Sequence, residues 1–202
     1  LAQDIIPLPQ AHAHNDYDQK IPLHNALAHG FTSIEADILN IRGRLYIGHD
    51  LPEEKYPALP TLRGAYLEPL YKIYTENDCQ IFPGYEGPFY LWIDIKNRPL
   101  YTYRKLNKVL LPFKSMLSHY EKGVFIPGKV TIIISGERPI KKILRDRNRM
   151  VVLDGRMEDM EMSYLSKLMP FVSQNMRDVC RTNHEGILSK SEFNKLKQFV
   201  KK

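Results

Sequence analysis

Residues 33–50 read SIEADILNIRGRLYIGHD, and the rest of the chain is organised around this stretch. Its first half alternates as a β-strand does, so the carboxylates of Glu35 and Asp37, two residues apart, share one face. Two adjacent carboxylates repel each other unless a positive charge neutralises them, and a divalent metal with oxygen ligands is suited to do so. After a turn, the apolar segment 45–48 returns to deliver His49. A surface ion pair and an ordinary loop histidine are the alternative that this stretch leaves open.

The whole-chain composition predicts a single globular domain. The 202 residues suffice for one hydrophobic core, and 43% hydrophobic with 26% charged residues is typical of folded proteins. The net charge of +6 suits an anionic ligand, such as a phosphodiester or a membrane surface. No apolar run is long enough for a membrane span, and no signal peptide is visible. Cys79 and Cys180 form no metal-type cluster, which leaves a disulfide and two free thiols as alternatives.

Short apolar strands alternate with amphipathic helices along the chain. Strands are expected over 10–15, 33–38, 89–96, 130–135, 150–154 and 171–175. Helices are expected over 22–29, 62–74, 101–120, 139–147 and 163–168, with a last helix capped by Ser189. Pro69 predicts either two short helices or a kink in the second of these segments, and Pro112 predicts a kink in the third. The alternation predicts an α/β fold whose parallel strands are covered by helices.

Polar side chains gather at the carboxyl ends of the first three predicted strands. His14 comes from the first strand, Glu35 and Asp37 from the second, and Asp94 and Lys96 from the third. In a parallel α/β barrel these strand ends meet at one rim, where active sites lie. A salt bridge made by Asp94 and Lys96 is the structural alternative, because ion pairs can mimic functional sites.

Several segments together resemble the glycerophosphodiester phosphodiesterase-like superfamily. They are HNDY, PLHNAL, SIEADI, GRLYIGHD, TLRGAYLEPL and FYLWIDIK, and the resemblance covers most of residues 10–175. That superfamily also contains phosphatidylinositol-specific phospholipases C and the sphingomyelinase D type of phospholipase, and the likeness is to a branch that begins with HNDY. The resemblance implies a TIM-type (β/α) barrel as a single domain over 1–202. Six strands are expected where such a barrel has eight, so we expect the last two to be missing; a fragment, omitted residues and a different closure all fit.

The resemblance implies roles for individual residues. His14 and His49 match the catalytic acid/base pair, and Glu35, Asp37 and Asp94 match the ligands of one divalent cation, Mg²⁺ or Ca²⁺. The implied activity is hydrolysis of a phosphoric diester, either a glycerophosphodiester or a phospholipid head group. One histidine takes a proton from the attacking hydroxyl and the other gives a proton to the leaving oxygen, while the metal offsets charge on the transition state.

The sequence also departs from the usual pattern of the superfamily. Asn15 and Asp16 follow the first histidine, where the usual enzymes have Arg-Gly, and Asp94 stands where many relatives have Glu. The resemblance makes Lys96 and Asn15 substrate-binding residues, Lys96 by contact with phosphate. Because the Asp-x-Lys form is similar to the sphingomyelinase D type, a phospholipase D-like lyase that yields a cyclic phosphate is one alternative. A catalytically silent binding module on the same scaffold is another.

The expected partner is a small-molecule or lipid phosphodiester. The protein is expected to be a monomer that can also bind peripherally to a membrane surface. No nucleic acid is expected, because the basic run 138–149 has no interleaved aromatic residues for base stacking. The resemblance, together with the extended segment 1–10 that Pro7 and Pro9 indicate, favours an extracytoplasmic location, either periplasmic or secreted. His12 shares a face with His14 but lies deeper along the strand, which leaves a site role and a structural role open.

Overall fold

The computed structural model describes residues 5–53, 58–162 and 166–200. The chain divides into two compact units, Leu1–Leu153 and Asp154–Lys202, and each is described by itself. Within the described ranges, every helix is too short or too polar to cross a bilayer.

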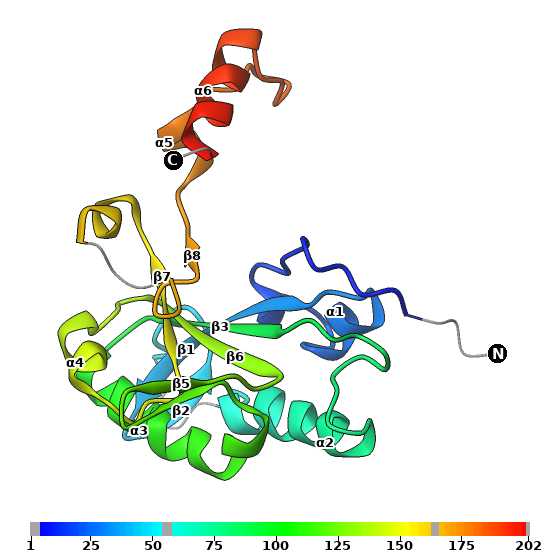
Figure 1. The fold of residues 1–202 in the computed structure, drawn as a ribbon, viewed down its shortest axis with the longest axis vertical. Helices are drawn as coiled ribbons and strands as arrows, with labels where there is room; N and C mark the ends of the chain where they lie inside the picture. Colours follow the sequence, from blue (N-terminus) through cyan, green and yellow to red (C-terminus); the bar gives the residue numbers. More distant parts are fainter. Residues whose placement is uncertain (1–4, 54–57, 163–165, 201–202) are drawn as a thin grey trace. The chain divides into compact units, whose positions relative to one another are not determined.

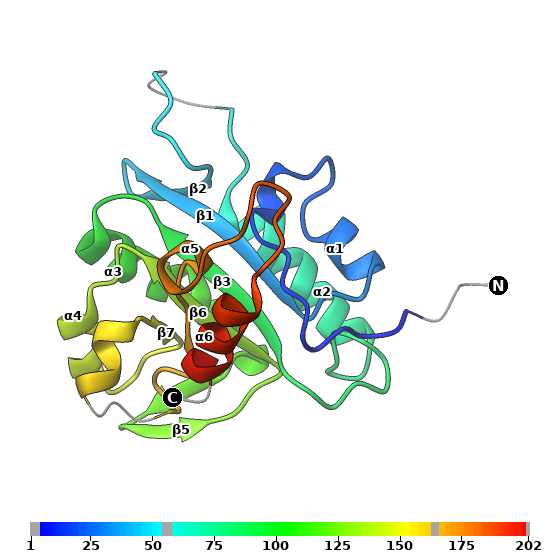
Figure 2. The same ribbon diagram turned by 90° about the horizontal axis from the view of Figure 1, so that it is seen from above.

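A mostly parallel sheet forms the centre of the first unit (Figure 1). Its strands are β1 (Ser33–Ile41), β2 (Arg44–Ile47), β3 (Phe89–Ile95), β6 (Val130–Gly136) and β7 (Val152–Gly155). They lie in the order β2-β1-β3-β6-β7, with β2 antiparallel to β1 and every other pair parallel (Figure 2). The predicted α/β fold with parallel strands is confirmed. The order of the described strands does not show a closed barrel, so the TIM-type barrel stays a prediction.

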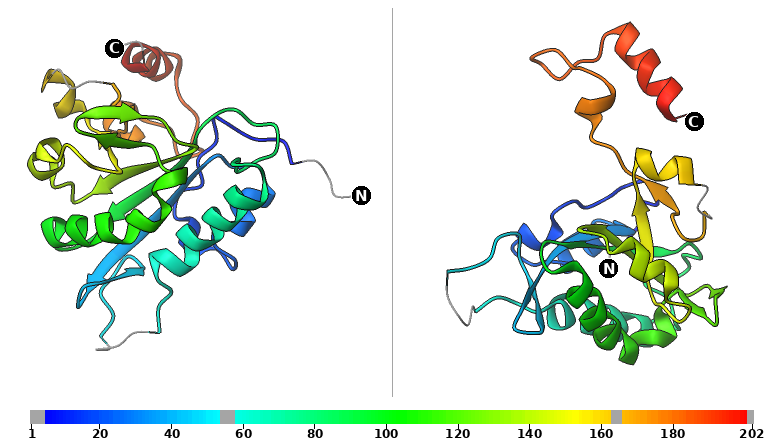
Figure 3. Two further views of the ribbon diagram at one scale, coloured as in Figure 1. Left: turned by 60° about the horizontal axis from the view of Figure 1, so that its bottom comes forward. Right: turned by 90° about the vertical axis from the view of Figure 1, so that its left-hand side faces the viewer.

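One face of this sheet packs against helices. In β3 the side chains of Phe89, Leu91, Ile93 and Ile95 are buried, while the residues between them are half-buried. The covering helices are α2 (Glu68–Glu76) and α3 (Pro99–Leu110), which lie along the same side of the strands in the left view of Figure 3. Alternation along the strand therefore sends apolar side chains to the helices and leaves the other face for polar residues.

The remaining helices and strands of the first unit are short. They are α1 (His24–Ala28), α4 (Ile140–Arg145) and the hairpin of β4 (His119–Glu121) and β5 (Val124–Ile126). The single helix predicted over 101–120 is wrong beyond Leu110, because Pro112 leads into a 3₁₀ helix, Leu111–Met116, and then into the hairpin. Pro69 lies in the first turn of α2, where proline is tolerated, and a π-helical turn, Arg63–Leu67, precedes it.

The predicted strand over 10–15 is reduced to a single bridge. Ala13 lies parallel to Ile34, its N–H donating to the carbonyl of Ser33 at 2.9 Å and its carbonyl accepting from Glu35 at 2.9 Å. Asn15 then adopts φ 51°, in the left-handed region, and a 3₁₀ helix begins at Asp16. The segment still lies beside β1 as predicted, but the backbone of Asn15 prevents a longer ladder.

The second unit holds β8 (Phe171–Val172), α5 (Met176–Val179) and α6 (Lys190–Val200). Strand β8 pairs in parallel with Asp154 and Gly155, the last two residues of β7, which belong to this second unit. The predicted cap of the last helix is present, because the N–H of Glu192 donates to Ser189 Oγ at 3.2 Å. The first half of the helix predicted over 163–168 lies outside the described residues, and a 3₁₀ helix, Met157–Met162, precedes it. The single domain over 1–202 stays a prediction.

Both cysteines carry free thiols. Cys79 is exposed and Cys180 is buried. Of the two alternatives left open by the sequence, the structure therefore has the free thiols and not the disulfide.

Candidate functional site

The polar face of the first unit combines two neighbouring strands. Ser33, Glu35 and Asp37 alternate to this face on β1, and Trp92 and Asp94 do so on β3. The parallel register sets Glu35 beside Trp92 and Asp37 beside Asp94. Residues 57 positions apart in sequence therefore lie side by side on one surface.

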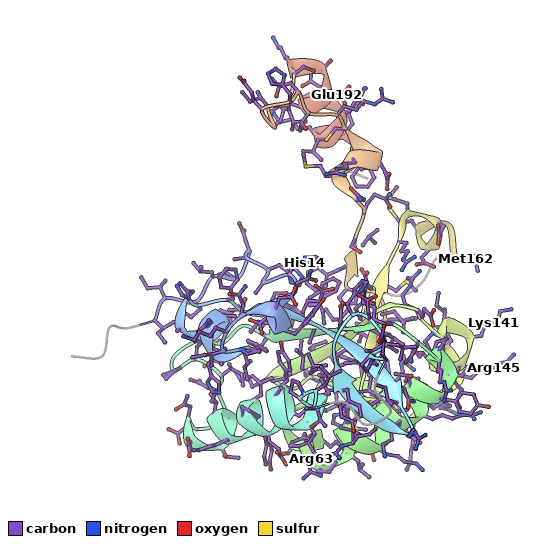
Figure 4. The ribbon with its side chains drawn as sticks, turned by 180° about the vertical axis from the view of Figure 1, so that it is seen from behind. His14, Arg63, Lys141, Arg145, Met162 and Glu192 are labelled. Carbon is purple, nitrogen blue, oxygen red and sulfur yellow. The ribbon has the colours of Figure 1, made fainter. Side chains whose placement is uncertain are left out.

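The segment before β1 brings its own side chains to this face. His14 lies on the opposite side of the sheet from Arg63, the residue at which the π-helical turn before α2 begins (Figure 4). The polar face and the helix-covered face are thus separate surfaces of the same strands.

Three carboxylates form an acidic trio on the polar face, namely Glu35, Asp37 and Asp94. One oxygen from each lies within 4.8 Å of the other two. Glu35 and Asp37 are buried, and Oδ1 of Asp37 has no hydrogen-bond partner among the described residues. A buried anionic oxygen without a partner is costly, and a set of carboxylate oxygens is what Mg²⁺ and Ca²⁺ prefer. The residues present therefore fit a hard divalent cation.

Lys96 lies against two members of the trio. Its Nζ is 3.1 Å from Oδ2 of Asp37 and 3.3 Å from Oδ2 of Asp94. Burial lowers the pKa of Lys96, but the hydrogen bond to Asp37 and the charge of Asp94 outweigh burial and raise it. The salt bridge that the sequence left as an alternative is therefore formed. One ammonium against three carboxylates leaves two negative charges for a cation to balance.

His14 and Asn15 both approach Glu35. The Nε2 of His14 lies 3.4 Å from Oε2 of Glu35, and its side chain is 72% exposed. The backbone N–H of Asn15 donates to the same oxygen at 2.9 Å. Burial raises the pKa of Glu35, against the opposing effects of the Asn15 hydrogen bond and the His14 charge. The contact of Asn15 with the trio comes from its backbone, held by the left-handed conformation.

Two further residues of the HNDY segment, Asp16 and Tyr17, make hydrogen bonds that support the site. These contacts were not predicted from the sequence. Tyr17 donates its hydroxyl to Oδ2 of Asp37 at 2.9 Å; burial and this bond raise its pKa, which keeps the phenol protonated. Asp16 is buried and accepts from the N–H of Leu23 at 2.6 Å and from the hydroxyl of Tyr66 at 2.8 Å. Asp16 therefore anchors the turn from which its neighbours reach the trio.

His49 lies beyond the end of β2, beside the HNDY segment. The N–H of Gly48 donates to the carbonyl of Asp37 at 3.1 Å, which brings the end of β2 to the strand of the trio. The imidazole of His49 is 59% exposed, and its Nδ1 is 3.1 Å from Oδ1 of Asp50. A surface cavity of about 650 Å³ is lined by His49 together with Asn15 and Tyr17, among others. The cavity connects the second histidine with the residues that hold the trio.

His12, which the sequence left between a site role and a structural role, also lies on the polar face. Its Nδ1 is 2.8 Å from Oγ of Ser33, and Nε1 of Trp92 donates to the same oxygen at 3.0 Å. The ring of His12 meets that of Trp92 edge-on at 5.3 Å between centroids. The sequence carried one signal for this contact, the spacing of two between His12 and His14.

Comparison with known proteins identifies the family. A family profile described as "AIM6-like phosphodiesterase domain" matches residues 1–154. This chain belongs to that family. The matched residues contain the whole polar face of the first unit, including both histidines and the acidic trio.

Individual relatives agree with the family assignment. "Altered inheritance of mitochondria protein 6 homolog" from Arthroderma benhamiae is 27% identical over 226 residues, covering 100% of this chain and 70% of that protein. "Altered inheritance of mitochondria protein 6" from Saccharomyces cerevisiae is 35% identical over 160 residues, and the protein of that name from Eremothecium gossypii is 31% identical over 157. Each of these two matches covers 69% of this chain and 40% of the relative. No solved structure matches the chain. The family thus supports a phosphodiesterase-type enzyme at a coarse level.

Proposed function

We propose that this chain carries the catalytic face of a metal-dependent phosphoric diester hydrolase of the glycerophosphodiester phosphodiesterase-like superfamily. The substrate is a glycerophosphodiester or a phospholipid head group. One observation carries the proposal: three carboxylates from adjacent parallel strands gather within 4.8 Å of one another. They do so beside an exposed imidazole, in a chain whose family is described as a phosphodiesterase domain.

In this proposal Glu35, Asp37 and Asp94 hold one Mg²⁺ or Ca²⁺. The bound cation supplies electrostatic stabilisation of the charge that develops on the phosphoryl oxygens. Hydrogen bonds already hold two of these carboxylates in place, since Tyr17 donates to Asp37 and the backbone of Asn15 donates to Glu35. Such outer contacts orient metal ligands and lower the cost of assembling the site.

Lys96 supplies a second positive charge at the site, in addition to the bound cation. Its ammonium remains charged beside Asp37 and Asp94, where it can also bind a phosphoryl oxygen of the diester. The positive net charge of the chain, +6, favours the approach of an anionic substrate.

His14 and His49 act as the acid/base pair. His14 is next to Glu35 and open to solvent, so its imidazole can take the proton from an attacking hydroxyl. His49 lines the same cavity as Asn15 and Tyr17, and its Nδ1 lies beside Asp50, which leaves Nε2 to donate to the leaving oxygen. The proposal also keeps the (β/α) barrel, with the polar face turned inward; the parallel order of β1, β3 and β6 supports it.

The test is a divalent-metal titration of diester cleavage. The chain is assayed with bis-p-nitrophenyl phosphate, glycerophosphocholine and lysophosphatidylcholine, in Mg²⁺, in Ca²⁺ and with chelator. We expect turnover that chelator abolishes and that His14→Ala and His49→Ala each remove. The absence of turnover with every divalent metal would overturn the enzyme assignment in favour of a binding module.

Phosphorus NMR of the products separates the two kinds of enzyme. The Asp-x-Lys pair, Asp94 and Lys96, is the feature that favours a lyase related to sphingomyelinase D. A cyclic phosphate as the final product supports the lyase, whereas an acyclic monoester supports the hydrolase.

A further inference from the structure

Toward the amino-terminal end of β1, the polar face carries a group of residues that the proposed mechanism does not use. His12, Ser33 and Trp92 are joined by two hydrogen bonds that meet at Oγ of Ser33. Ser33 itself is only 9% exposed. The three residues come from the segment 10–15 before β1, from β1 and from β3, which makes the group a tertiary contact.

The donor and acceptor chemistry of this group assigns the tautomer of His12. The indole of Trp92 can only donate, so Oγ of Ser33 accepts from it. The hydroxyl hydrogen of Ser33 then needs an acceptor, and Nδ1 of His12 is the one within reach among the described residues. His12 therefore accepts at Nδ1 and carries its own hydrogen on Nε2. Desolvation and the charge of His14 lower the pKa of His12, which agrees with a neutral ring.

The ring of His12 lies close enough to His14 for both to contact one bound ligand. His12 and His14 flank Ala13, whose bridge to Ile34 sets the two imidazoles on one side of the segment. Their centroids are 6.5 Å apart at 54°, too far for a hydrogen bond between the rings. An oxygen of a ligand bound beside the trio can lie between them. A fixed Nε2–H next to His14 is then a hydrogen-bond donor for a phosphoryl oxygen.

We propose that His12 is a phosphate-binding residue, whose Nε2–H donates to a non-bridging oxygen while Ser33 and Trp92 hold its tautomer. The inference deepens the proposed function and rests on it for the diester as ligand. It adds a neutral donor to the charged groups of the face, Lys96 and the bound cation. Its chemical basis is that a hydrogen bond to an anion is stronger than one between neutral groups.

The first experiment does not depend on turnover. Long-range proton–nitrogen correlation spectra of the ¹⁵N-histidine-labelled chain assign the tautomer of each imidazole, with His12 identified by its loss in His12→Gln. We expect His12 to be protonated at Nε2, and we expect Ser33→Ala to remove that preference. Added inorganic phosphate, in the presence of Mg²⁺, should shift the Nε2 resonance of His12 but leave His29 unchanged. His29 is the matched control, because its ring bonds to the carbonyl of Asn25 on its own helix.

The second experiment measures kcat/KM on whichever diester the chain cleaves. His12→Ala should lower kcat/KM about tenfold to hundredfold, mainly through KM, as expected for one lost hydrogen bond to an anion. His12→Gln, whose amide nitrogen can still donate, should recover part of the loss, and His29→Ala should have no effect. Gln also keeps the site filled if the alanine variant does not fold.

The outcomes separate this inference from the proposed function. Normal kinetics in His12→Ala, together with a His12 resonance that phosphate does not shift, would overturn the inference and leave the enzyme assignment intact. If no diester is cleaved but phosphate still shifts Nε2 of His12, the enzyme assignment fails and the phosphate site stands. A His12 protonated at Nδ1 in the free chain would overturn the assignment of the tautomer.

Discussion

The two faces of β1 and β3 differ in chemistry although they belong to the same strands. On one face Leu91 and Ile93 are fully buried, toward the side that α2 and α3 cover. On the other, Glu35 and Asp37 are buried close to each other, with Lys96 beside Asp37 and the imidazole of His14 beside Glu35. The apolar face stabilises the fold, whereas the polar face gathers charges that cost stability until a ligand binds. The comparison teaches that activity and stability can be changed separately, by substitutions on opposite faces.

The largest effect is expected from a ligand of the polar face. Asp94→Ala removes one of the three oxygens of the trio and leaves Lys96 with Asp37. We expect the diester-cleaving kcat/KM to fall by roughly a thousandfold or more, because metal stabilisation of a transition state contributes several kcal/mol. Calorimetric titration with Mg²⁺ should show weakened binding, while the far-ultraviolet circular dichroism stays unchanged. Activity within tenfold of the original would exclude Asp94 as a ligand.

The matched substitution on the apolar face is Ile93→Ala. Ile93 is fully buried on the strand that also carries Asp94. Truncation should lower the free energy of unfolding by about 2–5 kcal/mol, as in other cores, and leave kcat of the folded fraction near normal. Urea unfolding monitored by the fluorescence of Trp92 measures the first quantity. If Ile93→Ala instead abolished kcat in a fully folded sample, the two faces would not be separable.

Gly136 joins the two effects at one position. It has φ +64°, and a Cβ there would lie 1.9 Å from Oδ1 of Asp94 and 2.7 Å from the carbonyl of Ile95. Gly136→Ala should therefore lose about 1–3 kcal/mol of stability through strain and also weaken metal binding by displacing Asp94. Gly43→Ala is the control, because Gly43 has a similar φ of +79° but open space around its Cβ position. Equal Mg²⁺ affinity in the two variants would mean that Gly136 does not position Asp94.

The smallest effect is a gain in stability. Burial raises the pKa of Glu35, so the folded state holds the proton more tightly than the unfolded chain does. The stabilising contribution of Glu35 is thus fully present below the pKa of the unfolded chain, near 4.5, and is lost as pH rises through the higher pKa of the folded state. Without metal, Glu35→Gln should become more stable relative to wild type as pH rises from 4 to 7, by up to about 1 kcal/mol. Unfolding measured across that range tests the sign; a relative loss at pH 7 would contradict it.

Much of the sheet could be predicted from the sequence, because its strands are short apolar runs. The predicted ranges 33–38, 89–96 and 130–135 fall on β1, β3 and β6, where burial on the helix-covered face dictates the pattern. The hairpin of β4 and β5 was missed, because the apolar spacing of 101–120 continues the helical period past Pro112. Apolar spacing alone did not show that the α-helix ends at Leu110, before Pro112 leads into a 3₁₀ helix.

The candidate site was predictable in its charged members and not in the contacts between them. The alternation of Glu35 with Asp37, and the end of the β3 run at Asp94, follow from strand geometry. The reach of the Tyr17 hydroxyl to Asp37, by contrast, depends on the left-handed backbone of Asn15, which a single sequence does not specify. The hydrogen bonds of Ser33 were not predictable from the sequence either, because they join His12 and Trp92 from two other segments of the chain.

The most direct test of the central claim is a crystal structure of the chain grown with Mn²⁺, in which anomalous scattering locates the metal. The account predicts one strong peak about 2.0–2.6 Å from a carboxylate oxygen of each of Glu35, Asp37 and Asp94. A peak elsewhere, or none at saturating Mn²⁺ with Lys96 still bridging Asp37 and Asp94, would contradict the claim that the trio is a metal centre.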